Sequence, residues 1–313
     1  ARGPCDGPFK KIQGRSMSSD DARNVEKVRA LLDPRNVAIV GASDRPGSWA
    51  RNVFRTLDRH KYAGAIYPVN PRLKEIYGHT CYPGVRELPE PPDHVGIVVS
   101  SERVFDVLED CSAIGVRYAT VFSGGFAESG TDEGRARQKR LIEFGKAKGI
   151  RFMGPNCNGI INFIDRFAMT STAAIRDASA KSGDIGVVSH SGGLGQINVM
   201  WRTMEHGLGI SYEASCGNEA DIDTMDFARF MLHSESTNVV MLAIEGIKNG
   251  DKFRRLAEEA AERLKRMVPP QALGQGPTQN EQMLAQQVQQ LQSVLKATMD
   301  QLAVEKGKTQ ARL

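Results

Sequence analysis

The segment SHSGGLG, at Ser189–Gly195, places a histidine between serines and directly before paired glycines. Imidazole can exchange protons near neutral pH, and glycines let backbone N–H groups approach a phosphate closely. The segment follows DIGVV (184–188), an apolar run typical of a buried strand. His190 is therefore a candidate for a reactive centre, for a contact to a phosphate or an acid, or for a polar loop residue beside such a site.

Composition narrows the class of protein. The 313 residues suffice for two domains, and the content of 40% hydrophobic and 25% charged residues is typical of globular proteins. Five scattered cysteines without a CxxC pair favour reduced thiols and a cytoplasmic location over a disulfide frame or a metal site. The net charge of +4 is spread along the chain, which predicts no nucleic-acid partner. No stretch approaches the roughly 18 apolar residues of a membrane span.

The first part of the chain is predicted to be a doubly wound α/β domain over residues 25–157, preceded by a leader over residues 1–24. Short β-branched runs alternate with longer amphipathic stretches, which is the pattern of a parallel sheet covered on both faces. The expected strands are 36–40, 65–69, 94–99, 118–122 and 151–153, and the expected helices include 49–59, 103–114 and 132–148.

A second α/β unit is expected over residues 158–267, with strands at 185–188, 210–214 and 239–244 and helices at 194–206, 224–232 and 252–265. After Arg266 the chain becomes rich in glutamine, and residues 268–313 are predicted to be a helical tail. This tail is interpreted either as a short coiled-coil seam or as a lone amphipathic helix. The seam residues would be Leu284, Val288, Leu291, Leu295, Thr298 and Leu302. An incomplete second domain would expose a sheet edge, so self-association is expected.

The turn after the first strand, in VAIVGASDRPGSW, is the first candidate ligand site. Gly41 follows the strand, and Ser43, Asp44, Arg45 and Pro46 lead to a helix whose N–H groups could hold a phosphate. The spacing is not GxGxxG, and the second strand ends in YPVNPR without an acid for a ribose. Arg72 in that segment favours a phosphorylated ribose. A nicotinamide oxidoreductase is therefore the least favoured reading.

Further strand ends carry small or polar residues in VVSSE (98–102), FSGGF (122–126) and GPNCNG (154–159). In open α/β sheets the carboxyl ends of the strands form the ligand-binding edge. Loops favour Gly, Ser and Asn in any case, but four such loops on one edge predict a binding site.

These motifs carry a family resemblance. VAIVGAS, IYPVNP, FSGGFAE, GPNCNGIIN, VVSHSGGLG, SCGNEADID and IEGIKNG occur in this order, and together they resemble the NDP-forming acyl-CoA synthetases, relatives of the succinyl-CoA synthetase α subunit. The resemblance runs from about Val25 to Arg266. It implies a Rossmann-like CoA-binding domain followed by a flavodoxin-like domain. Within the family the sequence is similar to the branch that acts on aromatic acids such as ferulate.

The resemblance also implies roles for single residues. Ser191, Gly192 and Gly193 would cradle a phosphoryl group, and Glu245 of IEG would orient a phosphohistidine. The residues implied to contact CoA are Gly41, Ser43, Asp44, Arg45, Pro46, Arg72, Phe122, Ser123, Gly124 and Asn156. The full reaction would join CoA to a small carboxylic acid, and it would need ATP or ADP and Mg²⁺ held by an ATP-grasp domain or subunit.

The family's phosphohistidine lies in a later SHTG-like segment that this sequence does not contain, so His190 is predicted to be a neighbour of the phosphoryl site and not its carrier. Two functions therefore stand side by side: the CoA-binding part of an acid–CoA ligase that is inactive alone, and a non-catalytic CoA-binding module or sensor. The acids Asp221, Asp223 and Asp226 are interpreted as a helix N-terminus and not as a metal site.

Overall fold

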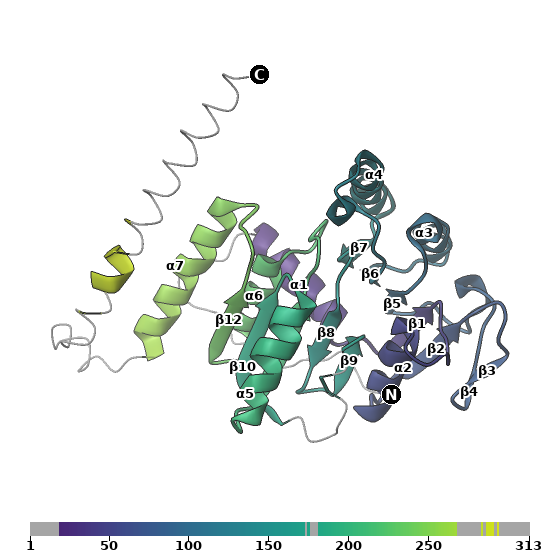
Figure 1. Ribbon diagram of the computed structural model, residues 1–313, viewed down its shortest axis with the longest axis horizontal. Coiled ribbons are helices and arrows are strands. Elements are labelled where there is room, and N and C mark those ends of the chain that lie inside the picture. Colours follow the sequence, from purple (N-terminus) through teal and green to yellow (C-terminus); the bar gives the residue numbers. More distant parts are fainter. Residues whose placement is uncertain are drawn as a thin grey trace. The chain divides into compact units, whose positions relative to one another are not determined.

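The computed structural model describes residues 19–172, 174–175, 181–267, 283, 286–290 and 293. It divides into two units, residues 1–256 and residues 257–313, and both large sheets belong to the first (Figure 1). The described part of the second unit is the end of helix α7 (Gly250–Met267) together with a few helical residues around 286–290.

The first sheet has five parallel strands in the order β2-β1-β5-β6-β7. They agree with the five predicted strands to within two residues. Their bounds are β1 (Asn36–Val40), β2 (Ala65–Val69), β5 (His94–Ile97), β6 (Tyr118–Val121) and β7 (Arg151–Met153). Strands β1 and β5 are neighbours, although the chain visits β2 between them. The winding direction therefore reverses between β1 and β5, and such a switch point is where open α/β sheets bind ligands.

Helices cover both faces of this sheet, which confirms the doubly wound α/β prediction (Figure 1). Helix α2 (Trp49–Arg59) packs Val53 and Phe54 into the same cluster as Ile39 of β1. Helices α3 (Val104–Ala113) and α4 (Asp132–Lys148) pack against the opposite face, where Val40 of β1 points. Alternate residues of a strand point to opposite faces, so each apolar residue of β1 serves one of the two cores.

The second sheet is mixed, in the order β12-β10-β11-β8-β9. Strands β10 (Ser182–Ser189), β11 (Ile210–Ser215) and β12 (Val239–Ala243) are parallel and correspond to the three predicted strands. Strands β8 (Gly159–Asn162) and β9 (Phe167–Thr170) form an antiparallel hairpin on β11 that the sequence analysis did not predict. Both are four residues long and buried throughout, so they show no polar–apolar alternation to mark them.

Helices also cover both faces of the parallel part of the second sheet. Helix α6 (Thr224–His233) begins with a reciprocal capping box between Asp223 and Asp226, and it packs on one face. The π-helical segment η4 (Gly193–Trp201) and the short helix α5 (Arg202–Glu205) pack on the other. Together η4 and α5 fill the predicted helix 194–206.

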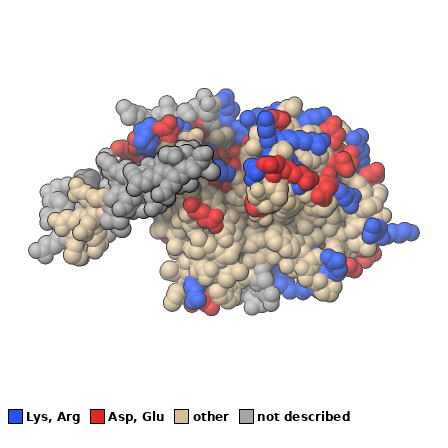
Figure 2. Space-filling view, turned by 45° about the horizontal axis from the view of Figure 1, so that its top comes forward, with Lys and Arg blue, Asp and Glu red and all other residues tan. Residues whose placement is uncertain are grey.

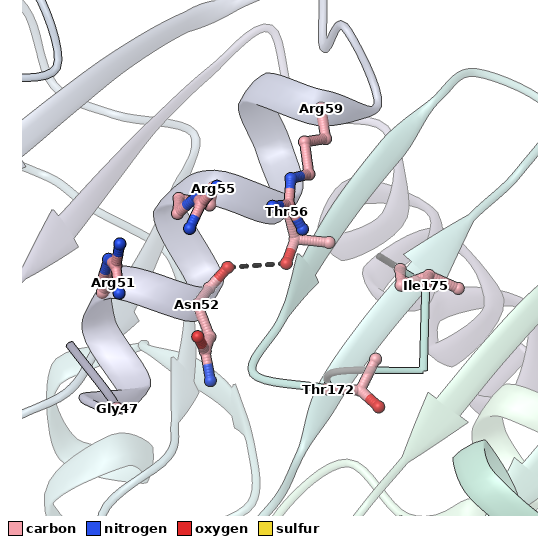
Figure 3. Close-up of a pocket in the computed structure, with 8 residues that line it drawn as sticks. All are labelled: Gly47, Arg51, Asn52, Arg55, Thr56, Arg59, Thr172 and Ile175. Atoms are coloured by element: carbon pink, nitrogen blue, oxygen red, sulfur yellow. Dashed lines mark hydrogen bonds between the residues drawn. The ribbon is translucent and has the colours of Figure 1, made fainter. Parts of the chain in front are cut away.

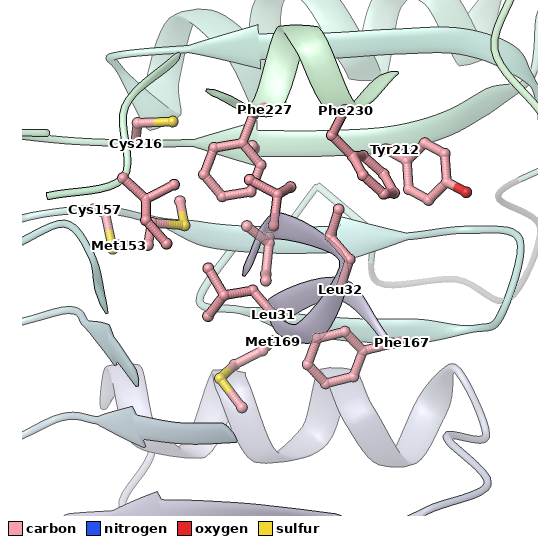
Figure 4. Close-up of a cluster of buried hydrophobic side chains, with 14 of the residues drawn as sticks. Leu31, Leu32, Met153, Cys157, Phe167, Met169, Tyr212, Cys216, Phe227 and Phe230 are labelled. Carbon is pink, nitrogen blue, oxygen red and sulfur yellow. The ribbon is translucent and has the colours of Figure 1, made fainter. Parts of the chain in front are cut away.

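Helix α1 (Ser19–Leu32) begins within the segment that the sequence analysis assigned to the leader. Its Leu31 and Leu32 are fully buried between the side chains of α6 and those of β9 (Figure 4). An ion pair at 2.7 Å joins Asp21 of α1 to the buried Arg229 of α6. The remaining elements are the hairpin β3 (Glu75–Ile76) and β4 (His79–Thr80) and the 3-10 turns η1 (Val85–Glu87), η2 (Ser101–Arg103) and η3 (Ala127–Ser129).

Strand β12 lies at the edge of the second sheet, and in the described chain it pairs only with β10. Val239 and Met241, on the side of the sheet away from α6, are 50% and 37% exposed. Of the proposed coiled-coil seam, only Val288 lies within the described residues, where it is helical and exposed. No helix in the described ranges is long and apolar enough to cross a membrane.

Candidate functional site

The loop after β1 touches the loop after β5 directly at the switch point of the first sheet. Gly41 has φ +90°, and a Cβ built on it would lie 2.2 Å from the carbonyl oxygen of Val98. Only glycine combines this backbone conformation with this close approach. The glycine of VAIVGAS therefore shapes the edge by letting two strand-end loops meet.

Asn70 fixes the loop after β2 to the loop after β1. Its Nδ2 donates to the carbonyl oxygen of Ala42 at 2.7 Å, and its Oδ1 accepts from the backbone N–H of Arg72 at 2.9 Å. Ser43 Oγ accepts from the N–H of Arg45 at 3.1 Å. Arg45 and Arg72 are exposed at this edge, and within the described residues no carboxylate lies within ion-pair distance of either. The exposed Asp44 and Pro46 occupy the same loop.

The predicted CoA residues after β6 and β7 include buried side chains, unlike the exposed Arg45 and Arg72. The side chain of Phe122 is buried in the core under the sheet, so it does not face a ligand at the edge. Ser123 is also buried, and its Oγ donates to the carbonyl oxygen of Val99 at 2.6 Å. The N–H of Asn156 donates to the carbonyl oxygen of Ser123 at 2.9 Å, and Gly124 lies beside Asn156. These residues tie the loops of the edge together and leave mainly backbone for a ligand.

The second sheet has its own switch point, between β10 and β12, and His190 lies there. The backbone N–H of His190 donates to the carbonyl oxygen of Ala243 after β12, and its carbonyl accepts from Gly217 after β11. Its Nδ1 accepts from the backbone N–H of Glu245 at 2.9 Å. An accepting Nδ1 carries no proton, so the neutral ring holds its proton on Nε2. His190 thus joins three strand-end loops.

Glu219 is the carboxylate that faces this imidazole, and the sequence analysis missed it. His190 Nε2 lies 2.9 Å from Glu219 Oε2, but the angle is not that of a direct hydrogen bond. The other oxygen, Oε1, accepts from the N–H of Thr224 at 2.6 Å, and the side chain of Glu219 is only 3% exposed. Lys248 Nζ lies 3.8 Å from Glu219 Oε2. The quoted motif SCGNEADID already contained Glu219, but only the fold shows what it faces.

Glu245 lies at the second edge, after β12. Its side chain is exposed, and it is its backbone N–H that contacts the imidazole of His190. Ser191 Oγ accepts from the N–H of Leu194 at 3.4 Å at the start of η4. Nothing lies closer than 3.8 Å to a Cβ built on Gly193, so space is open above this backbone.

Asn218 joins the two edges. Its Nδ2 donates to Gln138 Oε1 at 2.9 Å, and its Oδ1 accepts from Asn156 Nδ2 at 3.3 Å. The N–H of Asn218 also donates to the carbonyl oxygen of Pro155. The predicted CoA residues and the predicted phosphoryl residues therefore belong to loops that are in contact.

Glu213 of β11 is fully buried beneath η4, and burial raises its pKa to about 8. Gln196 of η4 donates to its Oε2 at 2.7 Å and partly opposes that shift. Burial likewise raises the pKa of the Cys157 thiol to about 12, which suits a structural thiol better than a nucleophile.

The three acids Asp221, Asp223 and Asp226 form ion pairs with basic side chains. Asp221 accepts two hydrogen bonds from Arg151, each at 2.7 Å. Asp223 and Asp226 both lie 2.7 Å from Lys252 Nζ, and burial raises the pKa of Asp226. This agrees with the interpretation of these acids as the N-terminus of a helix.

The fold is that of an α/β protein with one parallel and one mixed sheet whose carboxyl edges are in contact. Residues 35–162 match the family of CoA binding domains, and residues 182–311 match the succinyl-CoA ligase like flavodoxin domain. The second match runs past Arg266, where the sequence motifs had stopped. The chain is therefore homologous to the CoA-binding part of the NDP-forming acyl-CoA synthetases.

Similar proteins agree with this assignment. Acetate–CoA ligase (ADP-forming) I of Archaeoglobus fulgidus is 35% identical, over 74% of this chain and 33% of the relative. The α subunit of acetate–CoA ligase (ADP-forming) II of Pyrococcus furiosus is 33% identical, over 74% of this chain and 49% of the relative. A solved structure of dinucleotide-forming acetyl-coenzyme A synthetase 1 from Ca. Korarchaeum cryptofilum, in complex with phosphate and ADP, is 32% identical. It has a TM-score of 0.69 and covers 75% of this chain and 49% of that one. The chain thus spans between about a third and half of these relatives.

Proposed function

We propose that this chain is the CoA-binding and acyl-phosphate-binding part of an NDP-forming acid–CoA ligase. The observation that carries the proposal is the contact between the carboxyl edges of the two sheets, where Asn218 after β11 binds Asn156 after β7 and Gln138 of α4. In the proposed reaction the acyl group passes from a phosphate oxygen to the sulfur of CoA, and inorganic phosphate leaves. Such a step needs the two ligands held next to one another.

At the first edge, CoA would be held by phosphate contacts. Arg45 and Arg72 are exposed on two loops that Asn70 fixes together, and both have free donors for anionic oxygens. The absence of a neighbouring carboxylate within the described part of this edge leaves their charge available. The residues present therefore fit the phosphates of CoA.

At the second edge, Ser191, Gly192 and Gly193 would bind the phosphoryl group through backbone N–H groups at the start of η4. Both ring nitrogens of His190 face protein partners, so His190 would hold the loops and not carry the phosphoryl group. Glu245, with its exposed side chain, stays proposed as the residue that orients a phosphohistidine supplied from outside the described residues.

The partners follow from this assignment. We propose a small carboxylic acid as substrate, with an aromatic acid as the finer candidate from the motif resemblance. An ATP-grasp domain or subunit would supply ATP or ADP and Mg²⁺.

Acidic and basic side chains are interspersed on the face drawn in Figure 2, unlike the concentrated basic face of a nucleic-acid-binding protein. The cytoplasm stays the proposed location.

Calorimetric titration of the full chain with CoA and with NAD tests the proposal. We expect saturable CoA binding with micromolar affinity, on the order of −8 kcal/mol, and no saturation by NAD. Adding an acid, ATP, Mg²⁺ and an ATP-grasp partner should then produce acyl-CoA. CoA binding without any turnover in that mixture would favour the non-catalytic sensor, and no CoA binding at millimolar ligand would reject both.

A further inference from the structure

A row of three arginines lines a cavity along helix α2. Arg51, Arg55 and Arg59 are spaced at i, i+4 and i+8, so they project from one face of the helix. The cavity measures about 330 Å³, and Thr172 and Ile175 line its other side (Figure 3). Gly47 of the loop after β1 lines the end of the cavity next to Arg51, and Arg55 and Arg59 lie one and two helical turns further from that loop.

The positive charge of this row is not neutralised by the protein. Among the described residues, no carboxylate oxygen lies within 4.0 Å of the three guanidinium groups. Arg51 Nε donates to the hydroxyl of Tyr77 at 3.0 Å, which leaves the guanidinium charge uncompensated. All three side chains are half-buried. Like charges at this spacing destabilise a helix, and partly desolvated cations favour a counter-anion.

The walls of the cavity are held in place by hydrogen bonds from α2 to the segment after β9. Asn52 Nδ2 donates to the carbonyl oxygen of Ser171 at 3.3 Å, and Thr56 Oγ1 lies 3.2 Å from the carbonyl oxygen of Thr170. Thr56 and Thr172 are buried. The wall opposite the arginines, formed by Thr172 and Ile175, is thus preformed, which limits the conformational entropy that a ligand would have to remove.

We propose that this cavity, the α2 arginine site, binds a small polyanion made of linked phosphate groups, at a place separate from the CoA edge. Eight residues of helix extend about 12 Å, so the row suits a chain of phosphates better than a single one. Each guanidinium can bind two phosphate oxygens at once. A cavity, as opposed to a flat surface, favours a small ligand over a nucleic-acid backbone.

Calorimetry with inorganic tripolyphosphate as the probe tests the α2 arginine site. The double variant R55Q/R59Q should weaken tripolyphosphate binding about tenfold or more, while its affinity for CoA stays within about twofold of wild type. The control K139Q/K146Q removes the same charge from a shallow hollow on α4 that contains Glu143, and it should change tripolyphosphate binding less than about twofold. Because Arg55 and Arg59 lack a protein partner in the described chain and repel one another, the double variant should keep its melting temperature or raise it slightly.

Three results would overturn the α2 arginine site: no saturable tripolyphosphate binding by wild type, an equal loss in the control, or displacement of tripolyphosphate by saturating CoA. The last result would make the row part of the CoA edge. A parallel titration with ADP identifies the source of the phosphates. Binding of ADP with the same arginine dependence supports a nucleotide, and binding of tripolyphosphate alone supports a free polyphosphate. Failure of CoA to bind would reject the proposed function and leave the tripolyphosphate result intact.

Discussion

His190 Nδ1 accepts a hydrogen bond from the backbone N–H of Glu245 at 2.9 Å, and this contact joins the loop after β10 to the loop after β12. The two loops flank the switch point of the second sheet, where a phosphoryl group is proposed to bind. His190, a candidate reactive residue in the sequence, therefore holds the two loops in position.

Replacing His190 tests this positioning role. H190A should speed amide exchange at Glu245 and cost about 1 kcal/mol of stability, because the hydrogen bond that joins the two loops is lost. H190N is the matched control, since its side-chain oxygen can take the place of Nδ1 and should restore slow exchange at Glu245. Unchanged exchange in H190A would show that the loops are held without the imidazole.

Replacing Arg72 tests the CoA edge. R72Q should weaken CoA by about 1.5–3 kcal/mol, because a charge-assisted contact to phosphate is lost. R117Q removes the same charge next to the amino end of β6, on the opposite edge of the sheet, and should leave the affinity unchanged. Titration calorimetry compares the two, and equal affinities would remove Arg72 from the site.

Substitutions of Gly41 and Gly47 distinguish the cost of backbone strain from the cost of a steric clash. Both have positive φ. A Cβ built on Gly41 would lie 2.2 Å from the carbonyl oxygen of Val98, whereas a Cβ built on Gly47 would have no atom within 4 Å. G47A should lower the free energy of unfolding by about 1 kcal/mol. G41A should lower it by about 3 kcal/mol or more and should also abolish CoA binding. Urea denaturation measures both, and similar losses would mean that the two loops can separate cheaply.

The raised pKa of Glu213 predicts a stability that falls as pH rises. Between the unfolded value near 4.5 and the folded value of about 8, the folded state holds a proton that the unfolded state has lost. Raising the pH across this window therefore destabilises the protein, by up to about 1.4 kcal/mol per pH unit. E213Q should match wild type below the window and exceed it at pH 8. Parallel pH profiles of the two in urea denaturation would contradict a buried, protonated Glu213.

Among the described residues β12 pairs on one side only, and this open edge predicts self-association. M241K places a charge beside the edge, where it should oppose pairing between two copies and lower the associated fraction in sedimentation. L208K changes an apolar residue away from β12 that is 53% exposed, more than Met241, and it should have no such effect. A wild-type protein that sediments as a monomer at every concentration would show that the edge is protected.

Much of the fold follows from local pattern. The parallel strands were predictable because each is a short apolar run, and N-caps such as Ser48 before α2 and Asp223 before α6 mark where helices begin. The hairpin of β8 and β9 was not, because its residues are buried on both sides and pair with β11, about fifty residues further along the chain. A pairing of that range leaves no periodic mark on the sequence.

The candidate site divides in the same way. Glycines such as Gly41 are visible in a sequence because backbone geometry demands them, and Arg72 stands out by its place after a strand. The partner of His190 was not visible, because Glu219 comes from another loop and meets the imidazole only once the strands are side by side. Phe122 stays a predicted CoA residue, and the motif alone did not indicate that its side chain lies in the core beneath the sheet.

The ion pair between Asp21 and Arg229 has a consequence for synthesis on the ribosome. The two residues are 208 positions apart, so α1 leaves the ribosome long before α6 exists. At about 5–20 residues per second, Leu31 and Leu32 wait roughly 10–40 s for the surface that buries them. During that interval α1 exposes two leucines that the folded protein buries, and an exposed apolar surface of this kind is one that a chaperone can bind.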